Sequence, residues 1–225
     1  MKTMAFTALL ALGMAAGAAT ASSVQLDYQN SGPFGGDGTG EVVSIASPGY
    51  TGLVRAGGFH MTDNGVIGDF IAFCVDLSQY LGNSVTYTMG STLFANGVQS
   101  DIARLYSVAG DQVGDKLGSA AFQVALWEIV TDYNASSVYD LDSGDFLTPQ
   151  NGTGTEYNSN VETLAEAFLT DLSNGDPSEF RLTFFQSDTN QDLVTASPVP
   201  LPASALFLGG GLAVFAGLRR RRKTA

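Results

Sequence analysis

The segment KLGSAAFQVALWEIVTDY, residues 116–133, predicts a helix that is buried on nearly every side. Its apolar residues do not keep to one stripe, and a helix that is apolar all round belongs inside a domain. Asp115 precedes the segment and is suited to cap it. Two polar residues, Gln123 and Glu128, interrupt the apolar surface of this predicted helix.

The residues around this helix predict an α+β domain. Short β-branched and aromatic runs between Gly, Pro and Asn indicate strands, and periods of three to four residues indicate two more helices, capped by Asp101 and Asn160. The expected strands are 24–28, 41–45, 52–55, 69–77, 84–89 and 180–186, and the further helices are 101–109 and 161–172. We therefore expect an antiparallel β-sandwich or barrel-like sheet packed with a small helical subdomain. The polar, Gly-rich residues 136–158 predict a surface loop.

Residues 1–21 have the features of a signal peptide. Lys2 gives the positive start, an apolar stretch follows from residue 4 to residue 19, and Ala19-Thr20-Ala21 is an A-x-A cleavage site for signal peptidase. Residues 22–186 are then one globular body, since their number suits a single domain. We expect the polar residues 187–197 to form a stalk.

Residues 198–225 predict a membrane-targeting tail with three parts. A Pro-rich motif, Val199-Pro200-Leu201-Pro202-Ala203, opens an uncharged stretch that runs to residue 218, and five cations, Arg219, Arg220, Arg221, Arg222 and Lys223, follow it. Such a cationic end stays on the cytoplasmic side of a membrane. The apolar stretch is about 24 Å long as a helix, somewhat short of a hydrocarbon core of about 30 Å. A temporary anchor and a plain single-span tail anchor both fit these features.

This tail resembles the PEP-CTERM class of bacterial sorting signals in its VPLPA variant. The resemblance covers roughly the last 27 residues. It implies an exosortase-type membrane protease as a partner, a passing stay in the inner membrane, and a final place at the surface or in the extracellular matrix of a Gram-negative bacterium.

The charge of the exported part is strongly negative. All 22 acidic residues lie within residues 22–197, against only four basic ones, which gives a formal charge of −18. Such a surface repels phosphate backbones, which excludes nucleic acid as an expected partner. The acidic run Asp140-Leu-Asp142-Ser-Gly144-Asp145 hints at calcium but lacks the spacing of an EF-hand. We expect no cofactor and no defined metal site, with weak calcium uptake left open.

Two motifs carry the residues best suited to covalent chemistry. The first, residues 73–77, contains Cys74, the sole cysteine, which therefore has no disulfide partner in the chain. The second, residues 121–128, places Gln123, Ala125 and Trp127 in a Gln-x-Ala-x-Trp pattern. Together they resemble the thioester domains of bacterial surface proteins, over roughly residues 59–133. The resemblance implies a bond between the side chains of Cys74 and Gln123.

The residue types around these motifs suit that chemistry. A thiolate that attacks a carboxamide expels ammonia and leaves a thioester, which an amine or hydroxyl can open. Trp127 shares the helix face of Gln123 and could shield the bond, and Asp76 shares the strand face of Cys74 and could assist proton transfer. Phe122 stands where many members of the family have Thr. The bond would be used once, so we expect a binding protein that adheres covalently to a polysaccharide or protein surface, not an enzyme.

Two other functions fit the sequence less well. Cys74 as a small buried hydrophobe and Gln123 as a satisfied core residue would leave a structural, exopolysaccharide-associated matrix protein, stabilised by calcium on its acidic loops. A secreted hydrolase would need His60, the only histidine, which lies in a predicted Gly-rich turn without a recognisable nucleophile motif. This third function ranks last.

Overall fold

The computed structural model describes residues 22–29, 40–63, 65, 67–133, 138–149 and 159–200. The predicted signal peptide and the sorting signal beyond Pro200 lie outside these residues. Within the described ranges, no helix has the length and apolar character needed to cross a membrane.

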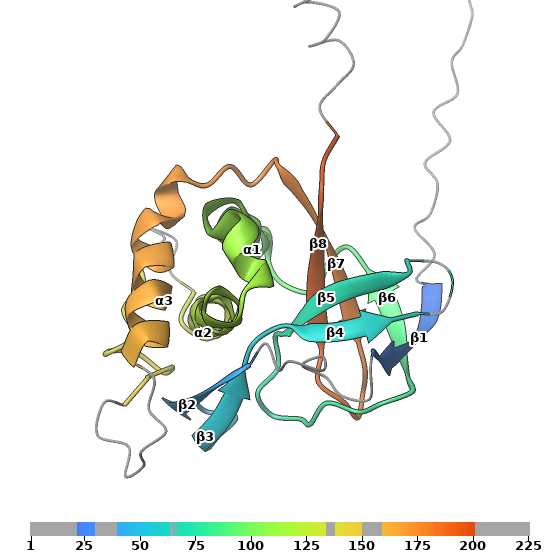
Figure 1. Ribbon diagram of the computed structural model, residues 1–225, viewed down its shortest axis with the longest axis horizontal. Helices are drawn as coiled ribbons and strands as arrows, with labels where there is room; N and C mark the ends of the chain where they lie inside the picture. Colours follow the sequence, from blue (N-terminus) through green and yellow to red (C-terminus); the bar gives the residue numbers. More distant parts are fainter. Residues whose placement is uncertain are drawn as a thin grey trace, which may run out of the picture.

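Six antiparallel strands close into a barrel in the order β1-β4-β5-β8-β7-β6, and β6 pairs back with β1 (Figure 1). The strands are β1 (Ser22–Tyr28), β4 (Phe59–Thr62), β5 (Asp69–Cys74), β6 (Val85–Gly90), β7 (Phe180–Gln186) and β8 (Leu193–Pro198). Closure leaves the barrel without free sheet edges. The expected α+β fold is thus confirmed, with the barrel rather than the sandwich as its sheet.

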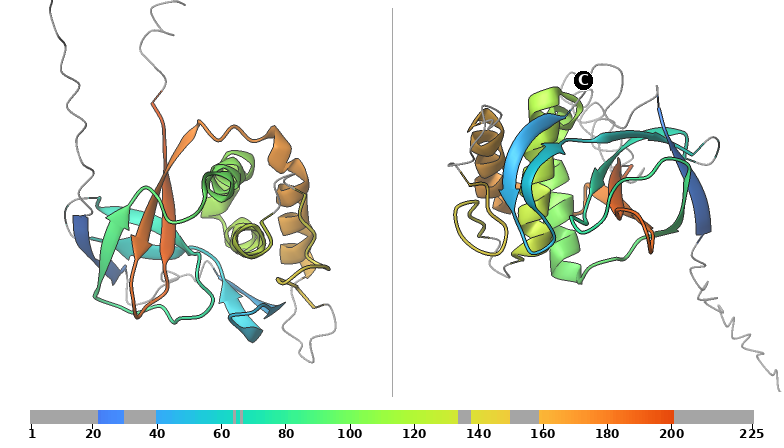
Figure 2. Two further views of the ribbon diagram at one scale, coloured as in Figure 1. Left: turned by 180° about the vertical axis from the view of Figure 1, so that it is seen from behind. Right: turned by 90° about the horizontal axis from the view of Figure 1, so that it is seen from below.

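Three helices gather on one side of the barrel (Figures 1 and 2). They are α1 (Asn96–Ala109), α2 (Lys116–Thr131) and α3 (Ser159–Asp171), with short 3₁₀ turns at Gly110–Gly114 and Leu172–Asn174. The central helix α2 packs against α1, α3 and β5 and is buried almost throughout, as its composition predicts. Its N-cap is the expected one, because the Asp115 carboxylate accepts a hydrogen bond from the Gly118 N–H at 2.7 Å.

A separate hairpin covers another side of α2. Strands β2 (Glu41–Ala46) and β3 (Thr51–Ala56) pair only with each other and pack on α2 instead of joining the barrel (Figure 2). Glu41 forms an ion pair with Lys116 at the start of α2, at 2.9 Å. Ala46 exchanges two backbone hydrogen bonds with Leu147, which attaches the loop after α2 to the hairpin.

An aromatic cluster joins the barrel to the helices. The ring of Phe73 on β5 lies 4.4 Å from that of Phe122 on α2, and Phe122 lies 4.5 Å from Tyr106 on α1. All three side chains are buried. Phe122 therefore fills the interface between barrel and helices, which explains a large apolar residue at this position.

The structure corrects the predicted stalk. Residues 193–197 of that stretch belong to strand β8, which pairs with both β5 and β7 and closes the barrel. Leu193 and Val194 are fully buried there. Only residues 187–192 form a polar connection, and two apolar residues were too few to predict a strand.

Strand β4 also replaces an expected turn. His60 lies in this strand, opposite Ile71 of β5, although its Gly-rich surroundings predicted a turn. The preceding Gly57 and Gly58 bring the chain into the strand. The prediction was wrong because those glycines bend the backbone before β4 and do not interrupt it.

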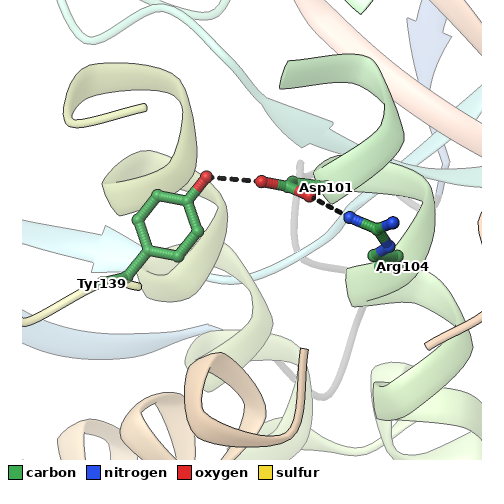
Figure 3. A network of polar contacts seen from close by, with 3 residues as sticks. All are labelled: Asp101, Arg104 and Tyr139. Carbon is green, nitrogen blue, oxygen red and sulfur yellow. Dashed lines mark hydrogen bonds and ion pairs between the residues drawn. The ribbon is translucent and has the colours of Figure 1, made fainter. Parts of the chain in front are cut away.

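Asp101 is not a helix cap, contrary to the prediction. Helix α1 begins at Asn96, five residues earlier, where the Gln99 side chain accepts a hydrogen bond from Leu93 N–H. Asp101 is only 2% exposed and binds two partners (Figure 3). Its carboxylate accepts hydrogen bonds from Arg104 at 2.8 Å and from the Tyr139 hydroxyl at 2.7 Å. It thus holds the loop after α2 against α1.

The expected cap Asn160 likewise lies inside the first turn of α3.

The described part of the predicted surface loop is partly a core element. Leu141 and Phe146 are fully buried. The Asp132 carboxylate, at the end of α2, accepts hydrogen bonds from the backbone N–H groups of Asp145 and Phe146. Gly144, directly before these two residues, has a φ of +110°, and a Cβ there would meet the same carboxylate. The loop is therefore fixed to α2.

Gly58 permits the close approach of β4 to α2. A Cβ at this position would lie 2.3 Å from Ile71 Cγ2 and 3.0 Å from Phe73 Cζ, and the Gly58 N–H donates to Ser119 Oγ at 2.7 Å. We expect Gly58→Ala to lower the free energy of unfolding by roughly 1 to 3 kcal/mol, because an extra methyl overpacks this junction. Denaturant unfolding measures the change. Gly65→Ala, where a Cβ meets nothing within 4 Å, is the control. Equal stability of the two variants would contradict this account.

Candidate functional site

The structure brings Cys74 and Gln123 together at the end of β5. The Gln123 carboxamide makes two hydrogen bonds with the backbone of Cys74: its oxygen accepts from the Cys74 N–H at 2.9 Å, and its nitrogen donates to the Cys74 carbonyl at 2.8 Å. Both residues are fully buried. The side chain of a helix residue thus continues the hydrogen-bond pattern of the strand and fixes the carboxamide beside the residue that carries the sulfur.

Local pairing and packing explain why β5 and α2 meet at Cys74 and Gln123. On one side β5 pairs with β4 and on the other with β8, with Cys74 opposite Leu193. Helix α2 is apolar enough to lie against the end of this strand, which desolvates Gln123. A buried carboxamide without partners would cost several kcal/mol, roughly 2–7. The two bonds to Cys74 remove that cost.

Asp76 contacts the sulfur through its backbone. The Cys74 thiol donates to the Asp76 carbonyl oxygen at 3.0 Å, while the Asp76 carboxylate accepts from the N–H and hydroxyl of Ser78. The predicted role of the Asp76 side chain in proton transfer assumed that the strand continues to residue 77. The strand ends at Cys74, so the chain turns and the carboxylate is directed to Ser78.

Trp127 lies beside Cys74, one helical turn after Gln123. Its indole N–H is buried and has no hydrogen-bond partner among the described residues, and the Trp127 side chain is one of the influences that lower the pKa of the Cys74 thiol. The ring also packs on Phe146, at 6.2 Å between centroids. Trp127 and Cys74 line the same pocket, and the shielding of the sulfur by the indole stays a prediction. Ala125 is fully buried too, in the apolar core around α2.

Burial raises the pKa of the Cys74 thiol to about 12. A backbone hydrogen bond at Asp76 and the side chain of Trp127 oppose this shift, and the charges of Asp76 and Asp192 add to it. The thiol is therefore protonated at neutral pH. Any attack by the sulfur must be accompanied by departure of its proton.

A pocket of about 340 Å³ lies beside Cys74. Cys74 and Trp127 contribute to its wall, although Cys74 exposes no surface to water. The other lining residues are Tyr28, Tyr50, Leu53, Val54, Arg55, Phe59, Leu77, Gln79, Tyr80, Leu81 and Gln191. A second pocket, of about 200 Å³, shares Leu77 and Trp127 with the first.

The other predicted residues lie outside this constellation. His60 is in β4 and does not line the larger pocket. In the ranges that the structure describes, no three acidic, His or Cys side chains are grouped so as to hold a metal ion. Of the sorting motif, Val199 and Pro200 are described, and Val199 donates a backbone hydrogen bond to Glu179. Its remaining residues Leu201, Pro202 and Ala203 and the basic residues 219–223 lie outside the described residues.

No protein-family model matches the chain, and no curated protein has a similar sequence. Among solved structures, one similar chain is the N-terminal thioester domain of a surface protein from Clostridium perfringens, in a cysteine-to-alanine mutant. The TM-score is 0.38 and the sequence identity 11%, over 63% of this chain and 89% of that chain. A similarity at this level does not by itself assign a fold or a function.

Glu128, next to Trp127, is a buried carboxyl that the sequence did not single out for a role. It is 1% exposed, and one of its oxygens accepts a hydrogen bond from Asp140 N–H at 3.1 Å. Burial, together with the charges of Asp132 and Asp140, raises the pKa of Glu128 from 4.5 to about 8. The carboxyl is therefore protonated at neutral pH.

The raised pKa of Glu128 predicts a stability that falls with pH. The folded state holds this proton more tightly than the unfolded state, so the contribution is complete below pH 4.5 and is lost as pH rises to about 8. Glu128→Gln should match the wild type at pH 4.5 and be more stable at pH 8.5 by roughly 2 to 4 kcal/mol. Thermal or urea unfolding across this range checks it, with the exposed Asp111→Asn as control. Parallel pH curves for Glu128→Gln and the wild type would refute the assignment.

Proposed function

We propose that this protein is an exported adhesin in which Cys74 and Gln123 form an internal thioester that couples it covalently to amine- or hydroxyl-bearing surfaces. The observation that carries the proposal is the double hydrogen bond between the Gln123 carboxamide and the Cys74 backbone. It holds a weak electrophile against the backbone of the residue that carries the sole thiol of the chain, in a buried site.

The geometry supplies two aids to bond formation. Fixing the two groups in contact converts a slow bimolecular step into an intramolecular one. The Cys74 N–H that donates to the carboxamide oxygen also polarises the carbonyl, and it remains in place for the negative charge that develops on this oxygen. Backbone donors of this kind stabilise tetrahedral intermediates in acyl transfer.

Formation of the thioester needs no reagent besides the two side chains. The Cys74 sulfur attacks the amide carbon of Gln123, the C–N bond breaks, and the thiol proton leaves with the nitrogen as ammonia. A thioester between the two side chains remains. The Trp127 indole N–H is placed to stabilise charge on the sulfur as the proton departs, which offsets part of the penalty from burial.

The exported location belongs to the same proposal. The signal-peptide pattern of residues 1–21 and the VPLPA-type tail of residues 198–225 support export, processing by an exosortase-type protease, and retention at the cell surface or in the matrix. An adhesin needs such a location to meet its target.

The competing function is a structural matrix protein without a reactive bond, and one observation favours it. The same double hydrogen bond gives Gln123 one accepted and one donated bond, as a structural glutamine at a strand end would need. The buried Trp127 N–H and the pocket above Cys74 favour the reactive function, since a purely structural pair requires neither.

Intact-mass spectrometry of freshly purified protein distinguishes the two functions. We expect a mass lower than the sequence mass by one ammonia, and loss of this difference on treatment with methylamine, which becomes attached at Gln123 and frees the Cys74 thiol. Cys74→Ala and Gln123→Ala should show the full mass and no incorporation. The exposed Gln112→Ala should behave as wild type. Full mass together with an alkylatable thiol in native wild-type protein would remove the reactive function.

Material taken from the cell surface tests the export route. Its intact mass should correspond to a chain that begins near Ser22 and ends near the Pro-rich motif, since both targeting segments are expected to be cut. Arg219–Lys223 replaced by neutral residues should lower the surface fraction several-fold, because the cytoplasmic stop is lost. Uncut full-length chain at the surface would contradict this route.

A further inference from the structure

The composition of the pocket above Cys74 bears on the class of nucleophile that it admits. Five of its lining residues are aromatic, and none of the described lining residues is acidic: Tyr28, Tyr50, Phe59, Tyr80 and Trp127 surround Arg55, the one charged residue of the wall. Residues 22–197 as a whole carry 22 acidic residues against four basic ones. The described walls of this pocket therefore lack the carboxylates that are abundant in the rest of the exported chain.

This charge pattern is unfavourable to an ammonium group. A lysine side chain entering the pocket would lose its hydration and would lie near the guanidinium of Arg55 instead of a carboxylate. Both effects raise the free energy of the charged ammonium in the pocket. Arg55 is held in the wall, where it donates to the Gly40 carbonyl at 3.0 Å. An uncharged ligand avoids both costs.

Three polar atoms of the pocket are available as acceptors. The Gln79 side-chain oxygen is buried and has no donor among the described residues. The hydroxyls of Tyr28 and Tyr50 donate to backbone carbonyls, at 3.2 Å to Leu81 and 3.3 Å to Leu53, so their oxygens remain available to accept. A ligand that fits these atoms supplies hydroxyl donors at several points and apolar C–H faces for the rings.

We infer that the pocket binds a neutral carbohydrate and that a sugar hydroxyl, not a lysine amine, is the physiological nucleophile. This inference rests on the proposed thioester and names its substrate class. The hydroxyl oxygen attacks the thioester carbon of Gln123, the C–S bond breaks, an ester forms, and the hydroxyl proton passes to the Cys74 sulfur. The product is a sugar ester of residue 123 with a free thiol.

Tyr80 offers a test that leaves the site intact. Its side chain is 84% exposed at the pocket rim, and only its backbone carbonyl is used in the fold, as an acceptor from Gln191 N–H. Wild-type protein incubated with neutral glucose, galactose and mannose oligosaccharides should give a mass adduct that hydroxylamine removes. Tyr80→Ala should slow this adduct roughly tenfold, as loss of one aromatic contact does, and should slow methylamine incorporation clearly less, because methylamine has no sugar ring to pack on the tyrosine. The control is Tyr133→Ala, a tyrosine outside the pocket wall.

Two outcomes would overturn the inference while the thioester stands. One is methylamine incorporation without any saccharide adduct. The other is an equal fall of both rates in Tyr80→Ala, which would indicate general damage to the site. Failure of the thioester itself is recognised separately by full native mass. Saccharide binding to Cys74→Ala, measured by saturation-transfer NMR, then reports on the pocket alone: binding lost in the Tyr80→Ala double variant supports carbohydrate recognition, and absence of binding refutes it.

Discussion

The structure depends on one buried carboxamide. Gln123 is a fully buried polar side chain of α2. Among the described residues, its two hydrogen bonds are both made with the backbone of Cys74. Because an unsatisfied carboxamide in this core is costly, the depth and rotation of α2 against the barrel are fixed by this contact. The position of Trp127 one turn later, and with it the predicted cover over the sulfur, follows from the same constraint.

This contact also explains how a poorly acidic thiol can belong to a reactive site. Burial raises the pKa of Cys74 far above neutrality, which makes free thiolate scarce. The same burial excludes water, which would otherwise hydrolyse a thioester. A slow, once-only reaction within the folded protein tolerates the first effect and gains from the second, whereas an enzyme with many turnovers would need a thiolate that is present at all times.

The sequence predicted the elements of the site better than the closure of the barrel. The apolar surface of α2 and its Asp115 cap are local signals, and the two motifs identified Cys74, Gln123 and Trp127 before any geometry was known. Strand β8 could not be found locally, because its apolar content is two buried residues and its identity as a strand comes from pairing with β5 and β7. The direction of the Asp76 carboxylate depends on where β5 ends, which composition does not reveal. The separate β2–β3 hairpin likewise depends on distant packing against α2.

Strand β8 connects the Cys74 site to the C-terminal end of the described residues, so that it can transmit force between them. Pro198 ends β8 directly before the proposed anchor motif, and β8 lies beside the stretch of β5 that holds Cys74, with Phe73 opposite Val194. For a molecule tethered at its C-terminal side and bonded to a surface through residue 123, tension would enter along the axis of β8. It would load the antiparallel ladders with β5 and β7 in shear, so that their hydrogen bonds share the force instead of opening one at a time. The same strand that closes the barrel would thus carry traction between cell and target.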